Sequence, residues 1–247
     1  MEPEQLLSDR SEMTGNRKRY KSLFFDLDDT LWDTAYNNKA CLEEIYADYQ
    51  FGRYYASFED FFDLYMPHNL MLWEKYRNHA IDRRTLILER LLYVLRPMGI
   101  DDEAFTLKLN NDFLQRTATK TKIVPGAIEL LEYLFTRYRL FILSNGFREI
   151  QFLKMKNSGL ALYFERLLLS EDIAIQKPHR RIFEYALKNT NSRRSESLMI
   201  GDAYEVDITG AQNAGIDQLW FNPTRQEAKG KLPTFTVHSL AEIKEIL

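Results

Sequence analysis

The sequence has 247 residues and a mass of 29.3 kDa, and its 33 basic and 36 acidic residues give a formal net charge of −3. This near-neutral charge offers no electrostatic basis for binding nucleic-acid polymers or an anionic membrane. The single cysteine, Cys41, excludes an intramolecular disulfide framework and a cysteine-rich zinc site, and the 45% hydrophobic content excludes global disorder.

The N-terminal segment 1–19 has no periodic apolar face and no apolar run that could form the core of a signal peptide. We expect this segment to be a flexible tail. No stretch of the chain reaches the roughly 18 apolar residues of a membrane span. These features predict a soluble, cytoplasmic protein that does not bind a membrane.

The segment 22–28, SLFFDLD, contains the first expected strand, because its continuous apolar run is typical of a strand buried on both faces of a parallel sheet. From 33 to 116 the apolar residues follow helical periodicity, and no clear strand occurs. Further strands are expected at 140–144, 197–202, 216–221 and 235–237, and helices at 127–138, 181–189, 205–215 and 240–247.

This alternation of strands and helices predicts an α/β fold with a doubly wound parallel sheet, a Rossmann-like core. The helical block interrupts the alternation after the first strand, so we expect it to be an inserted, all-helical cap domain. The length of the chain agrees with one domain that carries an insertion. The expected division assigns 20–32 and 117–247 to the core and 33–116 to the cap.

Polar residues follow the expected strands at the edge where such sheets bind ligands. Asp26 and Asp28 follow the first strand, Ser144 ends the second, and Asp202 follows a later one, with Lys177 before Pro178 as a fourth group. The strands and the polar groups are identified from different features of the sequence, and they coincide. We therefore expect these residues to form a single site.

The aspartates after the first strand suggest a metal. Asp26, Asp28 and Asp29 lie within four positions and should repel each other unless a cation neutralises them. A hard cation with oxygen ligands, above all Mg²⁺, fits this cluster, and Asp202 would supply a further carboxylate. The alternative is that Asp28 and Asp29 cap the next helix, which would be the preferred interpretation for one aspartate alone.

Ser144, Asn145 and Gly146 end a strand and begin a helix, where a hydroxyl and free backbone N–H groups together can bind an anion. The alternative here is an ordinary serine N-cap. Lys177 precedes a helix, where a cation is unfavourably placed for the helix dipole, which favours a role facing an anion.

As an ordered set, these segments resemble the motifs of the haloacid dehalogenase superfamily of phosphohydrolases. The motifs are D-x-D-x-T at Asp26, Asp28 and Thr30, the strand end at Ser144, Lys177-Pro178, and the segment from Gly201-Asp202 to Asp207. The resemblance extends over about 22–221. The segments FFDLDDTLWD, LSNG and GDAYEVDITGAQNAGI are similar to those of the subgroup of pyrimidine 5′-nucleotidases that act on UMP and TMP.

The resemblance implies a role for each residue of the motifs. Asp26 would attack phosphorus to form an aspartyl-phosphate, and Asp28 would protonate the leaving alcohol and then take a proton from water. It also implies that Mg²⁺ is held by Asp26, the backbone carbonyl of Asp28, and Asp202. The phosphate would be bound by Ser144, the Asn145 amide and Lys177. Asp207 would orient Lys177 or a metal-bound water, with Thr30 and Gly146 in supporting positions.

Several other activities remain open from the sequence. A small sugar-phosphate or phosphoglycolate phosphatase is the nearest alternative, and a phosphomutase would share both aspartates. A dehalogenase releases a halide and needs neither the acid at Asp28 nor Mg²⁺. A catalytically silent binding protein would retain the fold without turnover.

We expect substrate choice to depend on the cap, since the core motifs handle only phosphate and metal. The expected partner is a small phosphorylated metabolite, a nucleoside monophosphate, whose base would stack on aromatic side chains of the cap. The alternative is that most cap aromatics form the hydrophobic core of the cap. The sequence leaves the oligomeric state open.

Overall fold

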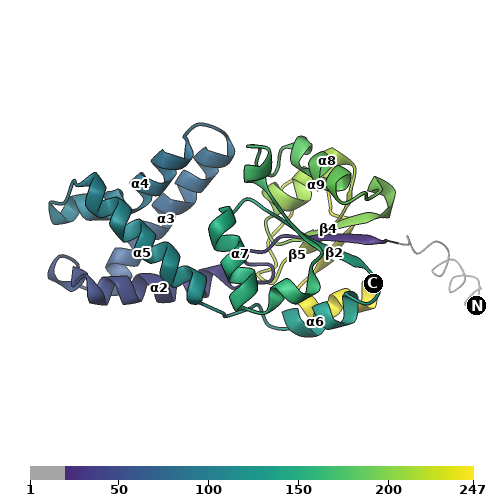
Figure 1. The fold of residues 1–247 in the computed structure, drawn as a ribbon, viewed down its shortest axis with the longest axis horizontal. Coiled ribbons are helices and arrows are strands. Elements are labelled where there is room, and N and C mark those ends of the chain that lie inside the picture. The colour runs from purple at the N-terminus through teal and green to yellow at the C-terminus, as the bar shows by residue number, and fades with distance from the viewer. Residues whose placement is uncertain (1–19) are drawn as a thin grey trace, which may run out of the picture.

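The computed structural model describes residues 20–247, so the expected tail 1–19 lies outside the described residues. Six parallel strands form one sheet in the order β3-β2-β1-β4-β5-β6 (Figure 1). Their bounds are β1 Ser22–Phe25, β2 Arg139–Ser144, β3 Arg166–Leu169, β4 Ser197–Gly201, β5 Asp217–Phe221 and β6 Phe235–Val237. The doubly wound parallel sheet expected from the sequence is confirmed.

Helices cover both faces of the sheet, so the side chains of β1 are buried whichever face they point to. Leu23 and Phe25 pack on one face, together with residues of α6 (Ala127–Leu134), α7 (Arg148–Asn157) and α10 (Ile243–Ile246). Phe24 packs on the other face, against α8 (Arg180–Asn189) and α9 (Thr209–Ala214). Every residue of β1 is buried, which explains why its sequence is a continuous apolar run rather than an alternating one.

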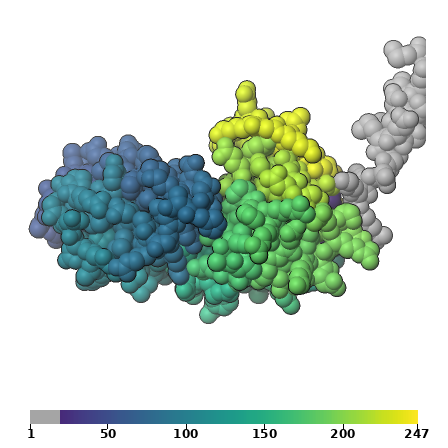
Figure 2. Space-filling model, turned by 90° about the horizontal axis from the view of Figure 1, so that it is seen from above, coloured from purple at the N-terminus to yellow at the C-terminus, as the bar shows by residue number. Residues whose placement is uncertain are grey.

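Four helices form the insertion between β1 and β2, namely α2 (Thr34–Asp48), α3 (Phe58–Arg77), α4 (Arg83–Leu95) and α5 (Glu103–Thr119). They make a separate lobe beside the sheet domain (Figure 2). This cap has its own hydrophobic core, in which Phe61 contacts several other aromatic rings. Many cap aromatics are therefore core residues, as the plainer alternative held. The division of the chain at 33 and 116 stays a prediction.

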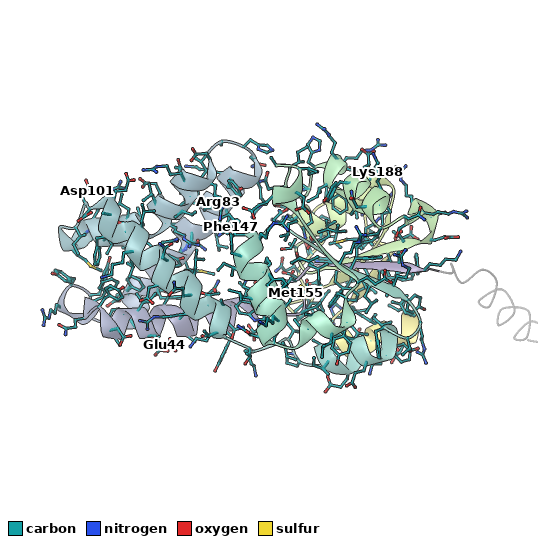
Figure 3. All side chains as sticks on the ribbon, viewed as in Figure 1. Glu44, Arg83, Asp101, Phe147, Met155 and Lys188 are labelled. Atoms are coloured by element: carbon teal, nitrogen blue, oxygen red, sulfur yellow. The ribbon has the colours of Figure 1, made fainter. Side chains whose placement is uncertain are left out.

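The cap and the sheet domain meet at Phe147, in the loop between β2 and α7 (Figure 3). The ring of Phe147 lies 5.4 Å from that of Trp73 in α3, and the guanidinium of Arg83 lies 4.4 Å from its centre. Arg83 also forms ion pairs with Glu149 and Glu171 of the sheet domain. These contacts hold the cap over the carboxyl ends of the strands.

Several expected elements differ in detail. The edge strand β3 was not predicted from the sequence, because its first residue is exposed and its apolar part is only three leucines, a run too short to distinguish a strand from a helix. The helix expected at 205–215 begins with a π-helical turn, Tyr204–Ile208, before α9. The C-terminal helix expected at 240–247 is a 3₁₀ turn followed by α10. Within residues 20–247, no helix has both the length and the apolar character to cross a bilayer.

Candidate active site

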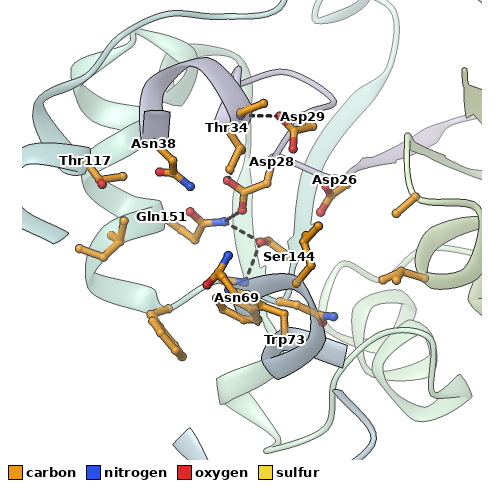
Figure 4. Close-up of a pocket in the computed structure, with 18 of the residues that line it drawn as sticks. Asp26, Asp28, Asp29, Thr34, Asn38, Asn69, Trp73, Thr117, Ser144 and Gln151 are labelled. Carbon is orange, nitrogen blue, oxygen red and sulfur yellow. Dashed lines mark hydrogen bonds between the residues drawn. The ribbon is translucent and has the colours of Figure 1, made fainter. Parts of the chain in front are cut away.

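The candidate site lies where β1, β2 and β4 end side by side. Phe25 is in register with Ile142 of β2 and with Ile200 of β4, so the residues that follow these strands meet at one edge of the sheet. The backbone N–H of Asp26 donates to the carbonyl of Ile200 at 2.9 Å, which fixes Asp26 directly after the strand. A cavity of about 390 Å³ opens here, between this edge and the cap (Figure 4).

Lys177 joins two carboxylates at the base of the cavity. Its Nζ lies 2.6 Å from Oδ1 of Asp26 and 2.7 Å from Oδ1 of Asp207, and all three side chains are largely buried. Burial alone would lower the pKa of Lys177, but the negative charges of Asp207 and Asp26 outweigh it and hold the pKa above its usual value. Lys177 is therefore a permanent cation, and it reaches the site from the loop between β3 and α8.

Asp202 lies beside this group and is oriented by Thr30. The Thr30 hydroxyl donates to Oδ1 of Asp202 at 2.9 Å and accepts from the Asp202 backbone N–H at 3.0 Å. Burial, together with the negative charges of Asp26 and Asp207, raises the pKa of Asp202 well above its ordinary value. Burial, with the negative charges of Asp207 and Asp28, raises the pKa of Asp26 to about 7 against the opposing charge of Lys177.

The charge balance of this group suits a divalent cation. Asp26, Asp202 and Asp207 each offer a carboxylate oxygen, and these oxygens lie within 4.8 Å of one another. Lys177, which pairs with Asp26 and Asp207, supplies one positive charge beside these three carboxylates, so two negative charges are uncompensated when all are ionised. The clustered oxygen donors and the raised pKa values both fit the position of a hard cation such as Mg²⁺.

Asp28 has partners that the sequence analysis did not identify. Its carboxylate accepts hydrogen bonds from Lys154 Nζ at 2.6 Å, Gln151 Nε2 at 2.6 Å and Thr34 Oγ1 at 2.8 Å. Burial would raise the pKa of Asp28, but the ammonium of Lys154 and these hydrogen bonds outweigh it and keep the pKa below its usual value. Gln151 and Lys154 lie one turn apart on α7, and both are buried.

The segment after β2 forms a second polar wall. The Ser144 hydroxyl oxygen accepts from the backbone N–H of Gly146 at 3.0 Å and from Gln151 Nε2 at 2.7 Å. The Asn145 side chain binds the backbone of Lys177 twice, by donating to its carbonyl and accepting from its N–H. Asn145 thereby fixes the loop that carries the lysine.

Two glycines make room for these side chains. A Cβ at Gly146 would lie 2.3 Å from Nε2 of Gln151, and a Cβ at Gly201 would lie 2.3 Å from Oδ2 of Asp207. Both contacts are shorter than any non-bonded approach allows, so a side chain at either position would displace a polar group of the site.

The structure brings the residues singled out from the sequence together. Eight of them line the cavity, and Thr30 supports Asp202 from behind; the eight are Asp26, Asp28, Ser144, Asn145, Gly146, Lys177, Asp202 and Asp207. The arrangement places a carboxylate next to a candidate cation site, a second carboxylate two residues away, and hydroxyl and ammonium groups suited to an anion. Such a set suits the transfer of an anionic group to a carboxylate.

Comparison with known proteins gives a consistent result. The sequence profile of the haloacid dehalogenase-like hydrolases matches residues 23–221. The chain is 34% identical to pyrimidine 5′-nucleotidase YjjG of Escherichia coli (strain K12) over 91% of this chain and 96% of that protein. It is 30% identical to pyrimidine 5′-nucleotidase PynA of Streptococcus pneumoniae over 92% of this chain and 95% of that protein.

Similarity extends to another activity and to a solved structure. A glyceraldehyde 3-phosphate phosphatase of Methanothermobacter thermautotrophicus is 27% identical over 92% of this chain and 99% of its own. The magnesium-bound crystal structure of the HAD-hydrolase YfnB from Bacillus subtilis has a TM-score of 0.84 at 27% identity, covering 93% of this chain and 99% of that one.

Proposed function

The chain belongs to the haloacid dehalogenase-like hydrolase family, and we propose that it is a magnesium-dependent phosphomonoester hydrolase that acts on pyrimidine nucleoside 5′-monophosphates. The pair Asp26 and Asp28, facing one cavity from the end of β1, carries the proposal of phosphoryl chemistry. The likeness to two pyrimidine 5′-nucleotidases over more than nine-tenths of the chain supports the nucleotide substrate.

Asp28 argues against dehalogenation. Cleavage of a carbon–halogen bond releases a halide, which needs no proton, whereas an alkoxide leaving group does. A half-buried carboxylate whose position is fixed by Lys154, Gln151 and Thr34 is suited to such proton transfer. Dehalogenation would not require this arrangement.

In the proposed reaction, Asp26 attacks the phosphorus atom, the P–O bond to the nucleoside breaks, and an aspartyl-phosphate forms. Asp28 donates a proton to the departing 5′ oxygen and then takes one from the water that hydrolyses the aspartyl-phosphate. The low pKa of Asp28 suits the second role, and a phosphate dianion in the same cavity would raise that pKa toward the first. Lys177 and the Ser144 hydroxyl would neutralise charge on the phosphate oxygens.

Mg²⁺ would be held by the Asp26 and Asp202 carboxylates and the backbone carbonyl of Asp28. When bound, Mg²⁺ would neutralise phosphate oxygens and keep Asp26 ionised. Thr30 positions Asp202 for this role, and Asp207 holds Lys177 in place.

The test is a substrate panel with purified protein and Mg²⁺. The panel contains an aryl phosphate, the nucleoside monophosphates UMP, TMP, CMP and AMP, phosphoglycolate and small sugar phosphates. We expect turnover of the aryl phosphate and the highest kcat/KM for UMP and TMP. A sugar phosphate preferred by orders of magnitude would refute the nucleotidase proposal, and binding of phosphate analogues without any turnover would indicate a silent binding protein.

A further inference from the structure

The cap side of the cavity contains polar groups that have no partner. The Oδ1 atoms of Asn38 in α2 and Asn69 in α3 are buried, and neither has a hydrogen-bond partner among residues 20–247. Both side chains line the cavity and point into it (Figure 4). Buried amide oxygens are almost always hydrogen-bonded in folded proteins, so two unpaired oxygens in one cavity indicate that a ligand supplies the missing donors.

Arg90 in α4 lines the same cavity and is an unpaired buried cation. It is 3% exposed, and its Nε and Nη2 donate only to the side-chain oxygen of Asn110. Its guanidinium lies 5.1 Å from the centre of the Phe113 ring. Within residues 20–247 it forms no ion pair, and neither of its hydrogen bonds goes to a carboxylate. Burying a charge without a counter-ion is unfavourable, which makes a ligand that brings hydrogen-bond acceptors the natural partner.

Flat apolar groups accompany these polar ones. Trp73 and Phe113, from α3 and α5, also line the cavity. Trp73 is held in place by its contact with Phe147, at 5.4 Å between ring centres. An aromatic wall beside unpaired donors and acceptors suits a flat heterocycle whose edge carries hydrogen-bonding groups.

We propose that Asn38, Asn69 and Arg90 form a specificity subsite that reads the polar edge of a uracil or thymine ring. This inference rests on the proposed function, since the phosphate at Asp26 anchors the nucleotide. The edge of uracil presents a carbonyl oxygen, the N3–H donor and a second carbonyl oxygen. A carboxamide can accept from N3–H while it donates to a neighbouring carbonyl, and a guanidinium can donate to carbonyl oxygens but cannot accept.

The same chemistry disfavours cytosine. Cytosine has an amino group in place of one carbonyl and no hydrogen on N3. A guanidinium facing that amino group would place one hydrogen-bond donor against another, with no acceptor between them. Wild-type protein should therefore prefer UMP and TMP to CMP. This preference follows from Arg90 and the two amides rather than from the catalytic groups of the sheet domain.

The test compares kcat/KM ratios in substituted proteins. Asn69→Asp keeps the size of the side chain but leaves only acceptors, which suit the amino group of cytosine. We expect the UMP/CMP ratio to fall by about tenfold or more, and the ratio of UMP to aryl phosphate to fall similarly. Asn38→Asp should act in the same direction. Asn111→Asp, an exposed position on α5, makes the same charge change outside the cavity and should leave both ratios at the wild-type value.

Arg90→Lys gives a second, independent variant. It keeps the positive charge but removes the planar fork of donors, so it should also lower the UMP/CMP ratio. A purely structural role would lower kcat/KM for all substrates in parallel and leave the ratios unchanged. The subsite is refuted if Asn69→Asp and Arg90→Lys retain wild-type ratios, or if Asn111→Asp shifts them equally.

Failure of the proposed function would look different. A wild-type protein that hydrolyses the aryl phosphate but no nucleotide refutes the nucleotidase proposal and the subsite together. A wild-type protein that prefers a monophosphate bearing a second anionic group to UMP would show that Arg90 binds an anion rather than a carbonyl edge. Preference for UMP with unchanged ratios in the variants refutes the subsite alone.

Discussion

Thr30 links the folded core to the candidate metal site, so its substitution tests how Asp202 is held. The Thr30 hydroxyl makes two hydrogen bonds to Asp202, at 2.9 and 3.0 Å, and Thr30 has no exposed surface. Thr30→Val replaces the hydroxyl with a methyl group of similar size, so it removes both hydrogen bonds without opening a large cavity. The carboxylate of Asp202 then loses a donor, and its backbone N–H loses an acceptor.

The magnitude follows from these two losses. A hydrogen bond to a charged group contributes about 1.5–3 kcal/mol, and a buried donor left unpaired costs about 1–3 kcal/mol. Because Asp202 is only partly covered, water can replace some of what is lost, and we expect the free energy of unfolding to fall by about 2–4 kcal/mol. The loss also raises the already elevated pKa of Asp202, which opposes cation binding. Removing such a supporting partner lowers metal affinity by about 10–100-fold.

The assay is a Mg²⁺ titration of aryl phosphate hydrolysis, paired with thermal unfolding. Thr30→Val should need about 10–100-fold more Mg²⁺ for half-maximal activity. Thr30→Ser keeps the hydroxyl and should resemble wild type. Thr34→Val removes a hydroxyl that faces Asp28 instead, and it should leave the Mg²⁺ requirement unchanged. A folded Thr30→Val protein with the wild-type Mg²⁺ requirement would refute the reasoning.

Two further predictions concern the carboxylates. Lys154→Met removes the ammonium 2.6 Å from Asp28, so the pKa of Asp28 rises. Because the first step needs protonated Asp28, the alkaline limb of the kcat/KM profile should move to higher pH, whereas the exposed Lys156→Met should not move it. Gly201→Ala forces a methyl group against the carboxylate of Asp207, 2.3 Å away, and should destabilise the fold by about 1–3 kcal/mol and lower kcat sharply. Wild-type kcat in a folded Gly201→Ala protein would contradict the close packing of Asp207.

The strand ends were predictable because each polar residue follows an apolar run. Asp26 and Asp202 come directly after buried strands and Ser144 is the last residue of β2, and the parallel register brings these positions together. Lys177 is less regular, since it reaches the site from a loop rather than from the end of a strand. Its proximity to Asp26 and Asp207 depends on the conformation of that loop, which cannot be predicted from the periodicity of the strands.

Helix α7 shows why the rest of the site was missed. Gln151 and Lys154 are buried at 1% and 5% exposure, while the apolar neighbours Phe152 and Leu153 are 58% and 37% exposed. This pattern is the reverse of an ordinary amphipathic helix, in which polar residues face solvent. Gln151 and Lys154 are buried because they bond Asp28, a long-range contact that local sequence does not reveal.

Asn38 and Asn69 of the cap could not be predicted from the sequence for a related reason. Asn38 and Asn69 lie in helices whose apolar residues form the core of the cap, and a polar residue in such a helix is ordinarily assigned to the surface. The packing of the four cap helices turns them toward the cavity instead. The dependence of substrate choice on the cap stays a prediction from the sequence, and the sequence could not identify the residues.

The central claim is that Asp26 carries the phosphoryl group during turnover. The most direct measurement is mass spectrometry of protein quenched in acid during hydrolysis of UMP or an aryl phosphate in the presence of Mg²⁺. We expect a phosphate on the peptide that contains Asp26, assigned to that side chain, and none in Asp26→Asn, which should be folded and inactive. Phosphate on a different residue, or continued turnover by Asp26→Asn at the wild-type rate, would contradict the mechanism.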